Sequence, residues 1–220
     1  MKLSATFSAA EKVSTDVIII SLFENTKKIP SELNAINKAS GGAISGLLKN
    51  GDFTGTLNET TIIPTDKKIV PKRILLVGLG KSADFTLDKV RQAAGTATRV
   101  VQGKKFKNSS MLLYRMETKW ISLEDVARSV AEGILLSRYN FTMYKTLKKE
   151  DKFDITSYSL VVQKNDVLKS IKSVVKEAEI VAEAVCFTRD IVNMAGSDAT
   201  PTFLANKAKE IAKKPGVKCK

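Results

Sequence analysis

Apolar and polar positions along the chain follow two periods, one typical of strands and one typical of helices. Alternating or continuously apolar stretches predict strands at residues 2–7, 17–23, 53–63, 72–77, 111–116 and 158–162. Apolar residues three and four apart predict helices at residues 31–48 (interrupted at Gly41–Gly42), 87–101, 122–134 and 165–193. This alternation indicates an α/β fold, with a mostly parallel or mixed sheet that helices cover on both faces.

Residues at the ends of these segments refine the prediction. Residues 2–7 alternate like an edge strand. Ser122, followed by Asp125 three positions later, resembles a capping box, although the usual partner is Glu or Gln. Residues 165–193 contain no Gly or Pro, so we expect one continuous helix there.

Length and apolar runs bound the class of protein. The chain has 220 residues, 43% hydrophobic and 27% charged, as an ordinary globular protein does. The longest apolar run, residues 17–20, is far shorter than the roughly 20 residues that a membrane span needs. No continuous apolar region precedes Glu11, so we expect no signal peptide and a cytoplasmic location.

Side-chain chemistry excludes several kinds of active site. The chain has no histidine, which rules out histidine-based triads and histidine-ligated zinc within it. Cys186 and Cys219 are too few and too far apart for a thiolate metal site or a disulfide framework, and Cys186 is expected in the core. The acidic pairs Glu124–Asp125 and Glu150–Asp151 lie at a predicted helix start or beside cations. We therefore predict no catalytic or metal-binding residue in this chain.

The net charge of +13, from 36 Lys and Arg against 23 Asp and Glu, permits non-specific contact with nucleic acid. Only seven of these cations are Arg, the residue that best reads base edges, so sequence-specific contacts are disfavoured. A surface that is simply rich in lysine is the alternative interpretation.

Gly78-Leu79-Gly80-Lys81-Ser82-Ala83 fits the dinucleotide-binding pattern G-x-G-x-x-A after a strand. Gly78 and Gly80 are therefore candidate phosphate-binding residues. No Asp or Glu occurs between Asp88 and Glu117, where such a site needs an acidic residue. A tight turn that requires glycine for its backbone angles is the favoured alternative.

The C-terminal segment carries a recognisable series of residues. Arg189-Asp190-Ile191-Val192-Asn193, then Thr200-Pro201 and Leu204-Ala205, resembles the junction before the catalytic domain of the leucyl aminopeptidase family, the M17 metallopeptidases. Three further segments are similar to family motifs in the same order. They are Phe53-Thr54-Gly55 with Glu59-Thr60, residues 74–80 (ILLVGLG), and Ala131-Glu132-Gly133 with Tyr139, Phe141, Tyr144 and Lys145.

Some positions depart from the family pattern. Ala195 and Ser197 replace the usual Pro and Asn of the junction, and Thr56 and Asn58 replace the usual Lys and Gly of the F-x-G-K-x-G-E-T hairpin. These departures indicate a divergent member of the family.

The resemblance implies a division of the chain. Residues 1–163 would form the family's macro-domain-like α/β N-terminal domain, and residues 164–220 the linker helix and the start of the catalytic domain. The family removes N-terminal residues from peptides as a hexamer. Its two divalent metals, zinc or manganese, are bound by residues after the junction, so none is carried over to this chain. We expect a truncated, catalytically inactive chain, with the last turns of the linker helix less covered than the first.

Two alternative functions stay open. A stand-alone macro-like module could bind a nucleotide or ADP-ribose, with Gly78 and Gly80 near a phosphate. The net charge also permits a module that binds DNA without sequence preference.

Overall fold

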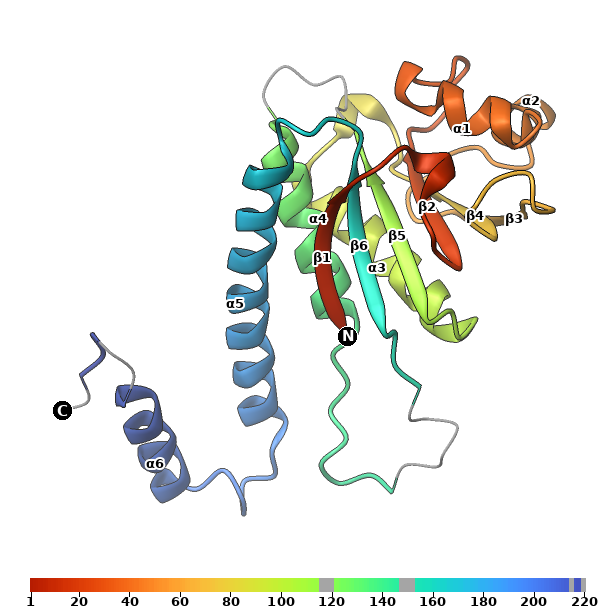
Figure 1. The fold of residues 1–220 in the computed structure, drawn as a ribbon. Helices are drawn as coiled ribbons and strands as arrows, with labels where there is room; N and C mark the ends of the chain where they lie inside the picture. The colour runs from red at the N-terminus through yellow and green to blue at the C-terminus, as the bar shows by residue number, and fades with distance from the viewer. Residues whose placement is uncertain (115–120, 147–152, 214–215, 219–220) are drawn as a thin grey trace. The chain divides into compact units, whose positions relative to one another are not determined.

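The computed structural model describes residues 1–114, 121–146, 153–213 and 216–218 (Figure 1). The strands are β1 (Lys2–Phe7), β2 (Val17–Leu22), β3 (Thr60–Pro64), β4 (Arg73–Gly78), β5 (Asn108–Leu113) and β6 (Ser157–Val162). The helices are α1 (Asn34–Ala39), α2 (Ala43–Asn50), α3 (Leu87–Gly103), α4 (Leu123–Ser137), α5 (Leu168–Asn193) and α6 (Pro201–Ala212). Short 3-10 turns occur at Ala10–Lys12, Ser31–Leu33 and Ser82–Asp84. The predicted strand end at Met116, the Glu150–Asp151 pair and Cys219 lie outside the described residues.

In the described part of the chain, six strands form one mixed sheet in the order β1-β6-β5-β2-β4-β3. All neighbours pair in parallel except β3, which runs antiparallel to β4 at one edge. β1 lies at the other edge, as its alternating pattern predicts. The predicted α/β fold with a mixed sheet is therefore confirmed.

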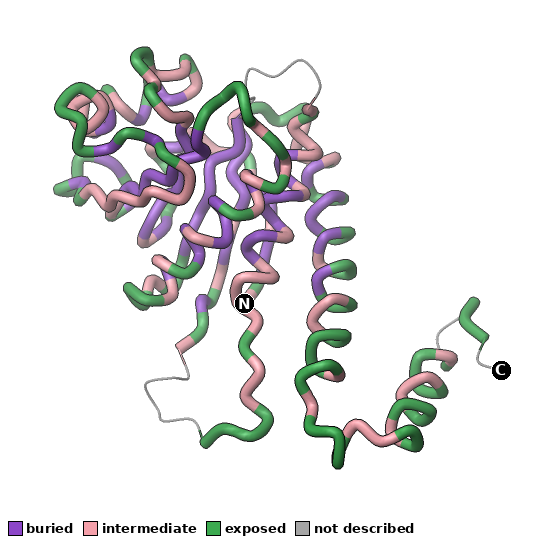
Figure 2. The backbone as a smooth tube through the Cα atoms, turned by 180° about the vertical axis from the view of Figure 1, so that it is seen from behind, coloured by how far each residue is buried: buried purple, intermediate pink, exposed green. Residues whose placement is uncertain are grey.

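Two apolar clusters, one on each face of the sheet, form the core. Ile19 of β2 belongs to the cluster that includes residues of α3, α4 and the first half of α5. Ile18 and Ile20 belong to the other cluster, which includes Leu33, Ile36 of α1 and Ile44 of α2. Because successive strand residues point to opposite faces, a continuously apolar strand such as β2 feeds both clusters. Figure 2 shows the central strands as buried over most of their length.

Helix α4 begins with the capping box that its sequence predicts. The Ser122 hydroxyl accepts from the Asp125 amide at 3.1 Å, and the Asp125 carboxylate accepts from the Ser122 amide at 3.3 Å. Asp125 thus fills the position that Glu or Gln usually takes. An ion pair of 2.6 Å between Arg91 on α3 and Glu132 on α4 links the two helices.

Helix α5 is one continuous helix, as predicted, and it is covered unevenly. Its buried residues, Ile171, Val174, Val175, Ala178 and Ala182, all lie at or before residue 182. The last turns, residues 183–193, contain no buried residue, which confirms that they are less covered than the first turns (Figure 2). In the described residues, none of the helices combines the length and apolar character that a membrane crossing requires.

Packing divides the chain into two compact units, Met1–Ala182 and Glu183–Lys220. The first half of α5 belongs to the first unit because its apolar residues join the core cluster of α3 and α4. The boundary expected from the sequence, between residues 163 and 164, marks the start of a linker and stays a prediction. The boundary from packing lies later in the chain than the boundary from the sequence, because the linker helix itself contributes to the core.

Substitutions in α5 test its covered half. Ala178 is fully buried, whereas Ala184 is exposed on the same helix. We expect Ala178→Pro to lower the free energy of unfolding by about 3 kcal/mol or more, and Ala178→Gly by about 1 kcal/mol plus the lost packing of one methyl group. Ala184→Gly, the control, should cost about 1 kcal/mol or less. Urea unfolding measures all three, and a loss below 1 kcal/mol for Ala178→Pro would contradict the helix.

Candidate functional site at the carboxyl edge of the sheet

Strands β2, β4 and β5 end side by side at the carboxyl edge of the sheet, because they are parallel neighbours. β2 lies between the other two. After β2 the chain forms β3 and β4 on one side of it, and it then crosses to the other side to form β5. Open α/β sheets bind ligands in the crevice outside such a reversal. The loops that follow these strands are therefore the natural place to look for a site.

A hollow of about 590 Å³ lies at these strand ends. Its lining includes Phe23 and Glu24 after β2, Ser82 after β4 and Tyr114 after β5, with Glu32 and Lys28 contributing charge. The Tyr114 hydroxyl donates to the Ser21 carbonyl oxygen. Burial raises the pKa of Tyr114 above its ordinary value, so the hydroxyl keeps its proton and serves as a fixed donor.

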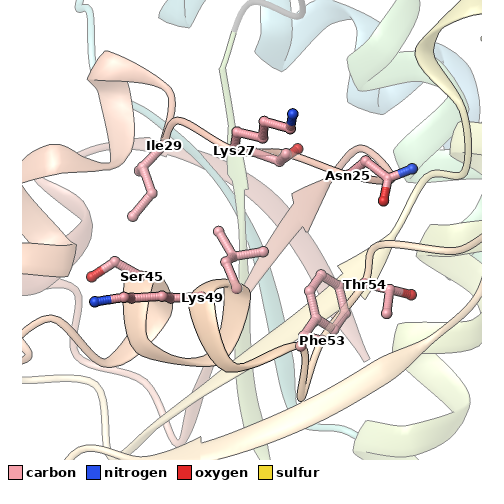
Figure 3. Close-up of a pocket in the computed structure, with 10 residues that line it drawn as sticks. Asn25, Lys27, Ile29, Ser45, Lys49, Phe53 and Thr54 are labelled. Atoms are coloured by element: carbon pink, nitrogen blue, oxygen red, sulfur yellow. The ribbon is translucent and has the colours of Figure 1, made fainter.

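A second hollow of about 510 Å³ lies between the loop of residues 25–29 and helix α2 (Figure 3). The loop supplies Asn25, Thr26, Lys27 and Ile29. The opposite side is formed by Ser45, Leu48, Lys49, Gly51, Phe53 and Thr54. The two hollows share Asn25, Thr26 and Ile29, so the loop forms a common wall. The sequence did not indicate either hollow, because their walls come from segments that are far apart in the chain.

The phosphate-loop candidates Gly78 and Gly80 contact a neighbouring loop of the same chain. The Gly78 amide donates to the Glu59 carbonyl at 2.9 Å, and the Gly80 amide donates to the Gly55 carbonyl at 3.0 Å. The Gly78 carbonyl accepts from the Asn58 amide at 3.0 Å. Both amides are thus engaged within the chain.

Close packing explains why glycine stands at these positions. A Cβ atom on Gly78 would collide with the carbonyl of Thr56 and would lie 2.7 Å from the Gly55 carbonyl oxygen. Gly80 has a φ of +73°, which glycine adopts without strain. Gly55 combines a φ of +82° with a close approach to the Phe23 carbonyl. A phosphate at this turn stays a prediction, since chain packing alone accounts for the glycines.

The loop of residues 54–59 is held by one carboxylate. Glu59 accepts from the amides of Thr54, Gly55 and Thr56 at 2.8–3.2 Å, and from the hydroxyls of Thr54 and Thr56 at 2.7 and 3.1 Å. Partial burial acts to raise the pKa of Glu59, but these hydrogen bonds, those from Thr54 foremost, outweigh it and lower the pKa below its ordinary value.

Both departures from the family hairpin fit this loop. Thr56, where the family has Lys, uses its hydroxyl to donate to Glu59. Asn58, where the family has Gly, has a φ of +66°, a conformation that Asn tolerates better than most residues. Its side-chain oxygen accepts from the Thr96 hydroxyl at 3.1 Å.

The acidic residues at the carboxyl edge do not converge on one point. Across the residues that the structure describes, no three or more Asp, Glu or Cys side chains are grouped so that they could hold a metal ion. The acidic residues near the hollows, Glu24, Glu32 and Glu59, are spread over different walls or engaged with their own loop. The geometry supports ligand binding or packing, and it assigns no chemical step to these residues.

The second compact unit contains the junction segment, residues 189–205. Arg189, Asp190 and Asn193 lie on the exposed last turns of α5. Thr200 caps α6 by accepting from the Phe203 amide at 3.2 Å, and Pro201 is the first helical residue. Large apolar side chains are exposed on both helices: Ile180, Val181, Phe187, Val192, Leu204 and Ile211.

The pKa of Glu59 predicts a pH-dependent contribution to stability. A carboxylate whose pKa is lowered by folding stabilises the protein above its unfolded pKa, about 4.3, and loses this effect as the pH falls through the folded pKa. We expect Glu59→Gln to cost about 1–3 kcal/mol at pH 7, and clearly less at pH 3. Urea unfolding at both pH values measures the difference. Glu183→Gln, at an exposed position of α5, is the control and should change stability little at either pH; an equal effect of both substitutions would contradict the role of Glu59.

This chain matches a known protein family and members of that family. The sequence model described as "Cytosol aminopeptidase family, N-terminal domain" matches residues 19–148. The probable cytosol aminopeptidase of Sulfurihydrogenibium sp. (strain YO3AOP1) is 30% identical over 220 residues, which are 100% of this chain and 43% of that protein.

Solved structures agree on the fold. A tomato leucine aminopeptidase mutant has a TM-score of 0.76 at 22% identity, with 97% of this chain and 42% of that chain covered. The bottromycin maturation enzyme BotP in complex with Mn has a TM-score of 0.64 at 21% identity, with 90% and 36% covered. This chain thus spans less than half the length of these proteins. The chain belongs to the cytosol aminopeptidase family and corresponds to that family's N-terminal domain.

Proposed function

We propose that this chain serves as the non-catalytic domain of a leucyl-aminopeptidase-like metallopeptidase, which removes N-terminal amino acids from peptides. The observation that carries the proposal is the match of the family's N-terminal domain to residues 19–148, in a chain that corresponds to 43% of a curated relative. In this account the peptide-cleaving step belongs to a C-terminal catalytic domain, and the present fold supports that domain.

The side chains of this chain are consistent with a supporting role. Two-metal hydrolysis needs several converging ligands and a position for the attacking water. The described residues do not fit that requirement, since no group of Asp, Glu or Cys among them could hold a metal. A relative is described as a complex with Mn. We therefore assign the divalent metals, zinc or manganese, to the catalytic domain and derive no step through them here.

Exposed apolar residues on α5, and separately on α6, are suited to contact that domain. Val192 is 77% exposed and Ile180 is 68% exposed, although both are large apolar side chains on a helix. Covering such residues is favourable by roughly 25 cal/mol per Å² of apolar surface. A catalytic domain that packs here would bury them. Hexamer formation and non-specific DNA contact stay predictions, and a cytoplasmic location is part of this proposal.

Activity measurements test the proposal directly. The 220-residue chain should not hydrolyse leucine p-nitroanilide above the blank when zinc or manganese is supplied, because its described residues offer no ligand set for the metals. Its melting temperature should not rise with either metal, since only a site that binds the native state would stabilise it. The Sulfurihydrogenibium relative, assayed in parallel, is the positive control. Metal-dependent hydrolysis that copurifies with the 220-residue chain through two orthogonal columns would overturn the proposal.

A further inference from the structure

The hollow between the loop of residues 25–29 and helix α2 has the size and position of a ligand site. Its volume of about 510 Å³ falls within the range of small-molecule pockets. One wall is the loop that leaves the carboxyl end of β2, where α/β sheets bind ligands. Figure 3 shows this loop above the hollow and α2 below it, with Phe53 and Thr54 at one end.

The floor and walls include apolar side chains. Ile29 extends from the loop toward α2 (Figure 3), and Leu48 lies on α2 itself. Phe53 is 1% exposed and belongs to the core cluster that Ile29 and Leu48 pack against. The apolar part of the site is thus anchored to a rigid core, which favours binding of an apolar group without rearrangement.

The charge of this hollow has one sign. Among its ten lining residues are two lysines, Lys27 on the loop and Lys49 on α2, and no acidic residue. Lys27 stands on the loop and Lys49 on α2, and in Figure 3 their ammonium groups point away from each other. Each carries a flexible four-carbon stem, so rotation of the stem can bring its charged head to an anion in the hollow. The neighbouring hollow differs, because Glu24 and Glu32 line it beside Lys28.

The hydroxyl groups of the hollow donate their protons within the chain. Thr26 donates to the Phe23 carbonyl at 2.7 Å, Ser45 to the Gly42 carbonyl at 2.9 Å, and Thr54 to Glu59 at 2.7 Å. They therefore offer lone pairs rather than protons to a ligand. The side-chain donors that remain for an anion are the two lysines and the Asn25 amide.

We propose that this hollow binds a small anion that carries an apolar group, with the anion bound by Lys27 and Lys49 and the apolar group against Ile29, Leu48 and Phe53. Phosphate monoesters and carboxylates share this chemistry. The site requires both parts of the ligand, since exposed lysines alone attract any anion weakly.

Four small molecules test whether binding requires both the anion and the apolar group. Each is titrated into the 220-residue chain and followed by ¹H–¹⁵N NMR. We expect 1-naphthyl phosphate and 1-naphthoate to shift the amides of residues 45–54. Neutral 1-naphthol and inorganic phosphate should bind at least tenfold more weakly. The better of the two anionic probes identifies the headgroup that the site prefers.

Two double variants, each of which removes two positive charges, test the role of the lysines. Lys27→Gln/Lys49→Gln should weaken binding of the preferred naphthyl anion about tenfold, at roughly 0.2–1 kcal/mol for each exposed ion pair. The control, Lys28→Gln/Lys38→Gln, removes two nearby cations that do not line this hollow, and it should change the Kd less than twofold. Unfolding temperatures of both variants establish that the fold is intact.

Several results would overturn the site. Equal weakening by both double variants would indicate general charge attraction, and equal binding of 1-naphthol would indicate an apolar surface without an anion site. Amide shifts confined to α5 and α6 would place the probe on their exposed apolar residues. No binding of either naphthyl anion at millimolar concentration would also exclude the proposal.

Discussion

The carboxyl edge of the sheet depends on a close approach between two backbones, at Gly78 and at the Thr56 carbonyl. No side chain larger than hydrogen fits at residue 78, so β4 can end beside the loop of residues 54–59 only with glycine there. Three backbone hydrogen bonds, from Gly78, Gly80 and Asn58, hold the two segments together. Glu59 then fixes the loop from inside by accepting from its amides and hydroxyls. Phe53, at the start of this segment, enters the core and lines one hollow.

Much of the fold could be predicted because apolar spacing directly reflects which faces are buried. The apolar run of β2 predicts a strand covered on both faces, and Ile18 and Ile19 do enter opposite clusters. The absence of Gly and Pro predicts an unbroken α5. The start of α5 at Leu168 rather than Asn165 is a local detail, since the Asn165 carbonyl accepts from the Leu168 amide in the preceding turn.

The candidate site could not be predicted in the same way, because it is made by contacts between distant segments. The sequence marks Gly78 and Gly80 as unusual, but it does not reveal that Thr56 and Gly55 stand against them. The hollow beside α2 likewise depends on how the loop of residues 25–29 crosses a helix that comes later in the chain. Nothing in the sequence distinguishes Lys27 and Lys49 from the other lysines. Both are exposed, and only the fold places them on the same hollow.

The most direct measurement of this account is the free energy of unfolding of Gly78→Ala beside that of Gly46→Ala. Gly46 lies within α2, where an added Cβ would meet nothing within 4 Å, so alanine there should be neutral or stabilising by up to about 1 kcal/mol. Gly78→Ala should cost about 2–4 kcal/mol, because the methyl group must displace the Thr56 backbone and its hydrogen bonds. A Gly78→Ala variant as stable as the Gly46→Ala variant would contradict the account.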